Sequence, residues 1–391
     1  MEQVSRHPRE ADHLTTICQV IDFPLDIPLL RGIAAHHDRS RFRHIVAALG
    51  PKNEAHARLE REGVKVFALG ACSRTGYPAA MARLVSLLRR EHVNIVQTHL
   101  FEPSLLGLLG GRLARVPAVV VTRHHSDFTT LMNKPVHRWL DRQQALRADL
   151  VMAVSAAVRR SMVELEHVPT GRIVVCPHGY DFDELRPSLI SQERDELRRA
   201  LGVPDSGPLL AVVARLCPLK GHQYLFRALP ELLVDWPGLR VVLAGGGPHQ
   251  QDLERQVAAE GLAGVVSFLG PRPDAQRIME AADIVVHPTL TEAFSHVIIE
   301  AMALERPLVA TDVAAAPEQV DTNETGVLVP ARDPKAMAAA ISSLLVDPGA
   351  ATEMGREARR RVVDRFSFPK MIGLYEEVYD RALTVRRASW R

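Results

Sequence analysis

The chain has 391 residues, of which 47% are hydrophobic and 24% are charged, a composition typical of globular proteins rather than disordered or fibrous ones. This length usually corresponds to two or three domains of about 100 to 200 residues each. The formal net charge is only +2, and no dense basic tract carries interleaved aromatic residues, so nucleic acid is not an expected partner.

Cysteine usage and hydropathy indicate the compartment. No run approaches the roughly 18 apolar residues needed to span a bilayer, and the opening segment MEQVSRHPREADH lacks the apolar core of a signal peptide. The four cysteines are widely spaced and fit neither a metal-ligand pattern nor a disulfide framework: they are Cys18, Cys72, Cys176 and Cys217. We expect reduced thiols that mostly fill the core and a cytoplasmic location, while the oligomeric state stays open.

Charge and histidine are distributed unevenly along the chain. Residues 1–185 carry 24 Lys and Arg against 19 Asp and Glu, and 13 of the 17 histidines, whereas residues 186–391 carry 24 against 27. A mildly basic, histidine-rich first half suits an anionic substrate or an acidic membrane surface, and a solvated surface explains it equally well. Peripheral contact with the inner face of a membrane therefore remains open.

Short apolar runs alternate with amphipathic helical stretches throughout the chain. The first half contains HIVAALG, VKVFALG, NIVQTHL, AVVVTRH, LVMAVS and IVVCPHG, and the second contains LLAVVARL, RVVLAGG, VVSFLG, IVVHPT, PLVAT and GVLVP. Continuous apolar strands separated by helices predict parallel sheets that are covered on both faces. A polar, proline-containing stretch at 181–208 separates the two series, so we predict two doubly wound α/β domains with a ligand cleft between them.

The strand-end loops of the second half carry two cations and a glycine-rich turn. Arg215 follows a buried strand in AVVARLCPLKG, and Lys220 lies just before a helix, whose N-terminus favours an anion. Either cation alone is more often a solvated surface charge, but the two together at a strand–loop–helix junction favour phosphate binding. Gly245 and Gly246 in VVLAGGGP indicate a tight turn, although they do not form a dinucleotide-binding fingerprint.

The segment TLTEAFSHVIIEAM places Glu292 and Glu300 eight positions apart. It is typical of a strand end, a loop and a buried helix with Ser295 near its N-cap. Glu292 would project from the loop into the cleft, and Glu300 would face the same cleft from the helix. Two carboxylates suit a ligand with two pairs of vicinal hydroxyls, and free N–H groups near Phe294 and Ser295 would bind phosphate. Alternatively, Glu292 is an acid near a helix cap and Glu300 belongs to a partly buried ion pair.

Several motifs occur in one order over residues 211–330: ARLCPLKG, LAGGGP, FLG, E-x7-E at 292–300, EAMAL-x-x-PLVAT and APEQV. This set resembles the donor-binding domain of the family 4 retaining glycosyltransferases, which have the GT-B fold and use nucleotide sugars. The similarity extends more thinly over nearly the whole chain, through IVQTHL, AVVVTRHHSD, VMAVSAAVR, CPHGYD and FSFPKMIGLYEEVYDRAL.

The resemblance implies two Rossmann-like domains that face a cleft, with a C-terminal helix that crosses back to the first domain. We accordingly place an acceptor-side domain at 1–185, a linker with its helix at 186–206, a donor-binding domain at 207–365 and the crossing helix at 366–391.

The resemblance also implies how the donor is held. Arg215 and Lys220 would bind its pyrophosphate and stabilise the leaving phosphate, Glu292 would hold hydroxyls of the transferred sugar, and Glu300 would hold the ribose. The rest of the donor site would comprise Gly245, Gly246 and the backbone of Ala293, Phe294 and Ser295.

On the acceptor side, the resemblance places His99, at the end of its strand, beside the reacting centre. His124 and His125 in TRHHSD would line the acceptor side. The catalytic set would then be His99, Arg215, Lys220 and Glu292. A single histidine at a strand end is more often structural, so His99 depends on the family resemblance.

The implied reaction moves a sugar from a nucleotide sugar, with a UDP- or GDP-sugar expected, to a hydroxyl of a glycan, a lipid-linked intermediate or a small natural product. Catalysis would rest on positioning and on electrostatic stabilisation of the leaving phosphate. No cofactor or metal would be required, because DFD at 181–183 lies in a segment that favours a turn. The family's glycine-rich loop after the first strand is replaced by CQVIDFPLDIPLLRGIAAH, which leaves the phosphate contacts of that loop open.

Three other functions compete with glycosyl transfer. A sugar-nucleotide epimerase on the same fold would convert donor without acceptor, and a non-catalytic nucleotide-sugar binding protein would bind donor without turnover. A nicotinamide-dependent oxidoreductase fits less well, because no G-x-G-x-x-G opens a βαβ unit.

Overall fold

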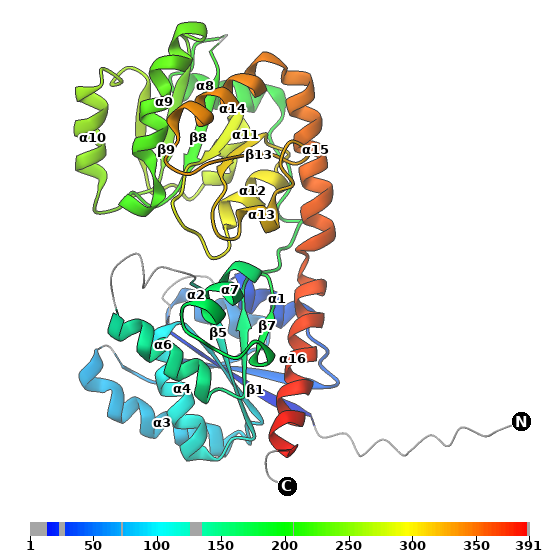
Figure 1. The fold of residues 1–391 in the computed structure, drawn as a ribbon. Helices are drawn as coiled ribbons and strands as arrows, with labels where there is room; N and C mark the ends of the chain where they lie inside the picture. The colour runs from blue at the N-terminus through cyan, green and yellow to red at the C-terminus, as the bar shows by residue number, and fades with distance from the viewer. Residues whose placement is uncertain (1–13, 23–27, 72, 126–134, 206, 389–391) are drawn as a thin grey trace, which may run out of the picture.

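The computed structural model describes residues 14–22, 28–71, 73–125, 135–205 and 207–388. Figure 1 shows two lobes, one above the other, with the last two helices running along one side of both. Each lobe is built around one parallel sheet, in strand orders β3-β2-β1-β4-β5-β6-β7 and β10-β9-β8-β11-β12-β13.

The first lobe contains seven strands with helices on both faces. Its strands are β1 (Thr15–Ile21), β2 (Phe42–Ala48), β3 (Lys65–Ala68), β4 (Ile95–His99), β5 (Ala118–Arg123), β6 (Leu150–Ala153) and β7 (Ile173–Val175). Its helices are α1 (Pro28–His36), α2 (Glu54–Arg61), α3 (Tyr77–Arg90), α4 (Phe101–Ala114), α6 (Pro135–Arg147) and α7 (Ala156–Glu164), with short turns η1 (Arg74–Gly76) and η2 (Thr170–Arg172).

The second lobe repeats this plan with six strands. They are β8 (Leu209–Val213), β9 (Arg240–Ala244), β10 (Val266–Gly270), β11 (Ile284–His287), β12 (Leu308–Thr311) and β13 (Val327–Val329). Its helices are α8 (Ser191–Ala200), η3 (Pro218–Lys220), α9 (His222–Asp235), α10 (Gln250–Ala259), α11 (Ala275–Ala281), α12 (His296–Ala303), α13 (Ala316–Gln319), α14 (Pro334–Val346) and α15 (Pro348–Arg365).

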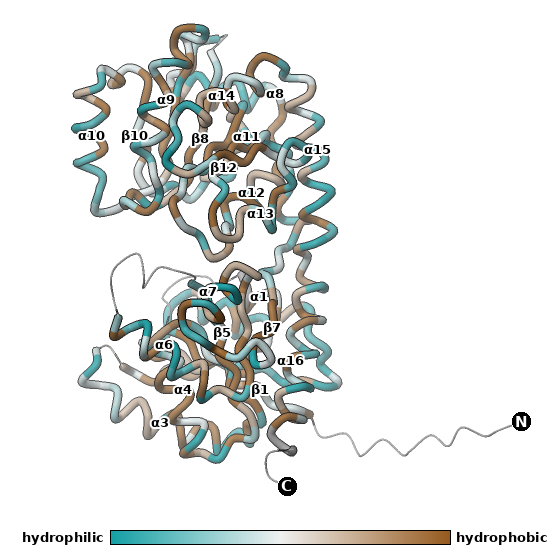
Figure 2. The backbone as a smooth tube through the Cα atoms, in the orientation of Figure 1, coloured by the Kyte–Doolittle hydropathy of each residue, from teal (hydrophilic) through white to brown (hydrophobic). Residues whose placement is uncertain are grey.

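The central strands are mostly apolar and are buried along their whole length, because helices cover both faces of each sheet. Every residue of β4, β5, β6, β11 and β12 is buried. Figure 2 shows the hydrophobic colour concentrated on the strands inside each lobe, and the hydrophilic colour along outward-facing helices such as α15. The structure thus confirms the predicted strands and the α/β class.

Both sheets reverse their winding direction at a central pair of strands. The reversal lies between β1 and β4 in the first sheet and between β8 and β11 in the second. In open α/β sheets the loops at such a switch point leave a crevice beyond the carboxyl ends of the strands, and ligands bind there. The predicted residues His99, Arg215, Lys220 and Glu292 all lie at or directly after the carboxyl ends of β4, β8 and β11.

The last helix, α16 (Phe368–Ala388), packs on the first lobe against α1, β5 and β6, whereas α15 packs on α12 of the second lobe. The crossing is held where the N–H of Tyr180 donates to the carbonyl of Phe366 at 2.8 Å and the N–H of Phe368 donates to Tyr180 at 3.2 Å. The Phe368 ring lies so close to Gly32 that a Cβ there would be 2.2 Å from it. The chain therefore returns to the first lobe, as the crossing helix was predicted to do.

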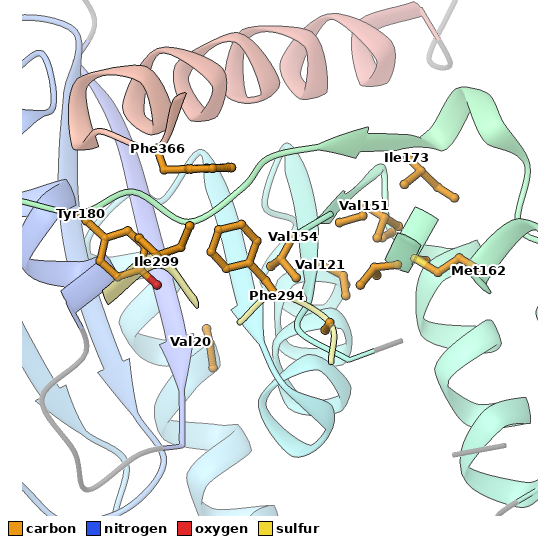
Figure 3. Close-up of a cluster of buried hydrophobic side chains, with 14 of the residues drawn as sticks. Val20, Val121, Val151, Val154, Met162, Ile173, Tyr180, Phe294, Ile299 and Phe366 are labelled. Carbon is orange, nitrogen blue, oxygen red and sulfur yellow. The ribbon is translucent and has the colours of Figure 1, made fainter. Parts of the chain in front are cut away.

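A single hydrophobic cluster continues from one lobe into the other. It contains Val154 from the first lobe, Phe294 from the second, and Phe366 from the crossing. Figure 3 shows Phe294 amid these side chains and Tyr180, and the rings of Phe294 and Phe366 meet edge to face at 5.5 Å. The two lobes are thus in packed contact around the loop that carries Glu292.

Two further sequence expectations concern the cysteines and the loop after β1. Cys18 and Cys176 are buried free thiols and Cys217 is a partly exposed one, as predicted, while Cys72 lies outside the described residues. The loop after the first strand, which lacks the family's glycine-rich sequence, falls largely on residues 23–27, also outside the described residues. Among the helices of the described ranges, none is long and apolar enough to cross a bilayer.

Candidate active site

The loop after β8 brings a cation to the start of α9. Lys220 ends the short turn η3, and Gly221 follows with φ +65° before α9 begins. A Cβ on Gly221 would approach the carbonyl oxygen of Pro288 to 2.0 Å. Only glycine fits both the left-handed backbone and this contact, so Gly221 places Lys220 against the loop after β11.

Glu292, in the loop after β11, forms an ion pair with Lys220. His287, the last residue of β11, lies 3.6 Å from the same carboxylate and 3.1 Å from the Ser295 hydroxyl. Burial opposes ionisation of Glu292, but its interactions with His287 and with the Lys220 ammonium outweigh that effect and lower its pKa to about 2. Glu292 is therefore a carboxylate at any physiological pH.

Glu300 has the opposite electrostatic character. Burial raises its pKa to about 7, and a hydrogen bond from Gln276 only partly opposes the shift. The nearby Tyr180 hydroxyl has its pKa raised by burial, then by the charge of Glu300, then by that of Glu292. The charges of Glu292 and Glu300 thus both raise the pKa of the Tyr180 hydroxyl at the lobe interface.

A cavity of about 340 Å³ opens between the lobes beside Glu300. Its lining includes Tyr180, Gln276 and His296, together with Arg31 and His36 from the first lobe. Glu300 therefore faces the space between the lobes, as the sequence predicted.

The segment from Ala293 to Ser295 is buried, and hydrogen bonds of Ser295 hold it in place. The Ser295 hydroxyl caps α12 by accepting the N–H of Ile298 at 3.3 Å, which confirms the predicted cap. The N–H of Ser295 donates to the Gln319 side-chain oxygen at 3.0 Å, and the Gln319 amide donates back to the Ser295 carbonyl at 2.9 Å. The expectation of a free N–H at Ser295 is therefore wrong, because a buried glutamine satisfies it.

The glycine-rich turn after β9 closes against the loop after β8. Gly245 has φ +150°, and a Cβ on it would lie 1.9 Å from the carbonyl oxygen of Ala214. The carbonyl of Gly246 accepts the N–H of Leu216 at 3.0 Å. The contact with Ala214 gives Gly245 a structural reason, and the hydrogen bond from Leu216 to Gly246 fixes the path of the neighbouring Arg215.

The Arg215 side chain is exposed and, within the described residues, forms neither a hydrogen bond nor an ion pair. Lys220 is already paired, so Arg215 is the cation of the two that is uncompensated in this structure. The loop after β8 therefore retains a positive charge for an anionic ligand.

His99 is buried at the end of β4. Its Nε2 lies 2.8 Å from the side-chain oxygen of Gln19, whose amide nitrogen donates to Gln97 at 3.0 Å. This network assigns the proton to Nε2, which leaves Nδ1 to accept from His124 Nε2 at 3.0 Å. Burial and the neighbouring His178 lower the pKa of His99 to about 3, so its ring is neutral.

Four histidines form one column across the interface. His99, His124 and His178 lie at or after strand ends of the first lobe, and His296 begins α12 of the second. His99 contacts His124, the ring of His124 stacks on His178 at 5.3 Å, and His178 stacks on His296 at 5.2 Å. His296 Nδ1 then hydrogen-bonds the Tyr180 hydroxyl. His99 and His124 were predicted from the sequence, whereas His178, His296 and Tyr180 were not. The pattern CPHGY at a strand end offered a signal for two of them.

His125, the other predicted acceptor-side histidine, belongs to a different group. Its Nε2 lies 3.0 Å from Asp141 and 3.4 Å from Arg123, and Arg123 pairs with Glu166 at 2.7 Å. The structure thus brings His99 and His124 together and separates His125 into a buried charge cluster.

The DFD sequence forms the turn that was predicted. Asp181 Oδ1 accepts the N–H groups of Asp183 at 2.9 Å and Glu184 at 3.2 Å. Across the described ranges, no group of three or more His, Cys, Asp or Glu side chains is placed to hold a metal ion.

Comparisons with known proteins match both lobes. A family model described as Glycosyltransferase Family 4 matches residues 29–184, and one described as Glycosyl transferases group 1 matches residues 193–361. The D-inositol 3-phosphate glycosyltransferase of Corynebacterium jeikeium is 31% identical over 324 residues, covering 78% of this chain and 77% of that protein. The chain belongs to glycosyltransferase family 4.

Further comparisons place this family 4 glycosyltransferase among related enzymes and folds. The alpha-D-kanosaminyltransferase of Streptomyces kanamyceticus is 27% identical over 286 residues, covering 69% of this chain and 73% of that protein. Among solved structures, HepE of Anabaena in complex with UDP and glucose superposes with a TM-score of 0.82 at 22% identity, over 94% of this chain and all of that one. These findings confirm the predicted GT-B fold and the glycosyltransferase class, and they lend no support to the epimerase or binding-protein alternatives.

Proposed function

We propose that this family 4 glycosyltransferase transfers a sugar from a nucleotide-sugar donor, a UDP- or GDP-sugar, to a hydroxyl of its acceptor, with retention of anomeric configuration and without a metal. The observation that carries this proposal is the convergence of Lys220, Glu292 and Glu300 at the switch point of the second sheet, with Arg215 uncompensated in the same loop as Lys220. Cations beside the start of a helix suit a pyrophosphate, and two separate carboxylates suit two diols.

In this proposal the two carboxylates have different ligands. Glu292, ionised through Lys220 and His287, accepts hydrogen bonds from hydroxyls of the transferred sugar. Glu300, at the interlobe cavity, binds the ribose hydroxyls. The backbone from Ala293 to Ser295 lines the donor, with the Ser295 carbonyl and N–H shaped by Gln319. Gly245 and Gly246 let the neighbouring turn approach the donor closely.

Lys220 and Arg215 stabilise the departing nucleotide phosphate. Its negative charge grows as the bond to the sugar breaks, and cations fixed in advance at that position favour the transition state over the bound donor. Lys220 is shared with Glu292 before donor arrives. When the donor binds, the Lys220 ammonium would therefore interact with both the Glu292 carboxylate and the phosphate.

His99 lies on the opposite side of the cleft and its two ring nitrogens are already engaged. The next residue, Leu100, has φ +69° and ψ 179°, a region that is normally confined to glycine and costs about 1–3 kcal/mol for other residues. Strain of this kind persists where function requires a particular backbone path. We assign the His99 carbonyl, with the ring fixed behind it, to the reacting sugar, and His124 to the acceptor side.

We expect retention from the family resemblance, and the groups in the cleft fit a front-face attack better than a double displacement. A double displacement needs a carboxylate nucleophile and a second carboxyl group about 5–5.5 Å away. Glu292 is neutralised by Lys220, and Glu300 is assigned to the ribose. Attack on the same face from which the phosphate leaves, with that phosphate accepting the acceptor proton, uses only the groups that are present.

The acceptor is expected to be a polyhydroxylated compound. Relatives named above act on D-inositol 3-phosphate or are named for kanosaminyl transfer, so D-inositol 3-phosphate is the first acceptor to test. An acceptor carried on a lipid would bring the enzyme to the inner face of a membrane. Leu105, Leu109 and Leu113 are 37%, 51% and 58% exposed along α4, an apolar stripe that supports such a peripheral contact. Sedimentation with phosphatidylglycerol vesicles would test it.

The deciding experiment is a thermal-shift and calorimetric screen against UDP-, GDP-, ADP- and dTDP-sugars, with Glu300→Ala alongside. We expect one nucleotide series to raise the melting temperature, and the variant to weaken that effect. Mass spectrometry of the reaction with acceptor should then show one added sugar, and NMR of the product gives its anomeric configuration. If no nucleotide sugar binds at millimolar concentration, the donor assignment fails. An inverted product would overturn retention.

A further inference from the structure

A carboxylate from the second lobe caps a helix of the first. The first N–H groups of a helix have no partner within it, and in α7 the N–H groups of Ala156 and Ala157 both donate to Glu318, at 2.7 and 2.6 Å. Glu318 lies in α13 of the second lobe, 162 residues from Ala156 in the sequence. A negative charge at this end of the helix is also favoured by the helix dipole.

The N-cap of the same helix makes a second contact between the lobes. The Ser155 hydroxyl accepts the N–H of Val158 at 3.1 Å, which is the usual capping bond, and donates its own proton to the carbonyl of Ala293 at 2.6 Å. Ala293 directly follows Glu292 in the loop assigned to the donor. The start of α7 therefore touches α13 and the donor loop together.

The donor loop and α13 are also joined to each other. Gln319, next to Glu318, is fully buried and bonds both the N–H and the carbonyl of Ser295. The N–H of Ala315, just before α13, lies 3.4 Å from the Glu292 carbonyl. Neighbouring residues of one short helix thus hold the first lobe and the donor loop, respectively.

We propose that Glu318 and Ser155 are positioning residues that couple closure of the two lobes to the shape of the donor loop. When α7 docks, Glu318 and Ser155 fix α13 and Ala293, and through Gln319 they fix Ser295. When the lobes separate, the N–H groups of α7 and the carbonyl of Ala293 form hydrogen bonds with water instead. The donor loop then loses the contacts from Ser155 and Glu318. The donor loop reaches its bound shape only with the first lobe in place.

This coupling serves the proposed reaction, on which its catalytic meaning rests. His99 belongs to the first lobe, whereas Glu292 and Lys220 belong to the second. A donor loop that takes shape only on closure confines sugar transfer to the state in which both sets of groups surround the sugar. Water has less access to the activated donor in that state.

The test is amide hydrogen exchange of the ligand-free protein, which does not depend on activity. Glu318→Gln removes the charge, and its amide group cannot accept both N–H donors. Ala156→Pro deletes one donor from the other lobe, at a first helical position that tolerates proline. We expect each variant to speed exchange at Ala157 and at Ser295 by a similar factor of about ten, a size typical of losing a helix cap.

Arg160→Ala is the matched control. Arg160 is on the same helix and lies 3.9 Å from Glu318, but its side chain is 58% exposed, so we expect wild-type exchange at both amides. Exchange that rises at Ala157 but not at Ser295 in Ala156→Pro would reduce Glu318 to a local cap and overturn the coupling. Unprotected amides at both positions in the wild type would overturn it as well.

Kinetics test the positioning role separately. With the donor selected by the screen, Glu318→Gln should lower kcat about tenfold while the affinity for the free nucleoside diphosphate stays within about twofold, because its proposed ligands lie in the second lobe. Unchanged kcat with the expected exchange result would leave the coupling standing and remove its role in catalysis.

Discussion

Lys220 and Glu292 neutralise each other across two loops of the second sheet. Lys220 ends the turn after β8 and Glu292 lies in the loop after β11, 72 residues further along the chain. Their side chains are 16% and 23% exposed, so the pair is screened from water more than a surface pair would be. A ligand that enters between the lobes therefore meets a pre-formed ion pair, and the unpaired side chain of Arg215 lies in the same loop as Lys220.

Removing either cation should impair turnover. A charge-assisted contact contributes about 1.5–3 kcal/mol, so Lys220→Ala and Arg215→Ala should each lower kcat at least about tenfold with the fold retained. Lys335→Ala, an exposed lysine on α14, is the control and should behave as wild type. Steady-state kinetics with the donor selected by the screen measure the effect, and wild-type rates in both variants would refute the assignment.

Glu300 should make stability depend on pH in one direction. Its pKa in the folded protein is about 7, above the value of about 4.3 expected when unfolded. Between these values the folded state binds more protons, so its contribution to stability is lost as pH rises through that window. Glu300→Gln removes the titration. The variant should therefore gain stability relative to wild type between about pH 5 and about pH 7.5, as measured by urea unfolding; a constant difference would contradict the burial argument.

His178 should make the stability of the protein depend on pH in the opposite direction. Burial, then His124 and His296, lower its pKa well below the ordinary value, so below about pH 6.5 the unfolded state binds more protons and stability falls as pH falls. His178→Phe keeps a ring in the stack without a titrating group. It should lose less stability than wild type between about pH 7.5 and about pH 5. His167→Asn, at an exposed position with φ +53°, is the control, and equal losses in all three proteins would refute the prediction.

Gly245→Ala should destabilise the second lobe. A Cβ would lie 1.9 Å from the Ala214 carbonyl, and the backbone there has φ +150°, so the loops after β8 and β9 would have to separate. We expect a loss of at least about 2 kcal/mol. Gly264→Ala, where no atom lies within 4 Å of the added Cβ, should cost less than about 0.5 kcal/mol. Calorimetric melting compares the two, and equal melting temperatures would show that the turn adapts.

Much of this architecture was predictable because it follows from local patterns in the sequence. Apolar runs of strand length between helical stretches predicted both parallel sheets, since a strand buried on both faces needs no polar side chain. Ser295 before an apolar helix predicted its cap. Arg215, Lys220 and Glu292 were predicted for the cleft because each follows a strand, and parallel strands end at one edge of their sheet. The family resemblance, carried by motifs in order, added His99 and the GT-B arrangement.

The sequence by itself therefore determined the strands, their parallel pairing and the loops that carry the charged groups, because burial and periodicity act over a few neighbouring residues. Only the tertiary structure decided which groups meet. The column from His99 to His296, the capture of the Ser295 N–H by Gln319 and the capping of α7 by Glu318 each join distant parts of the chain. Contacts of this kind depend on how the lobes and loops pack. The spacing of residues along the sequence does not specify that packing.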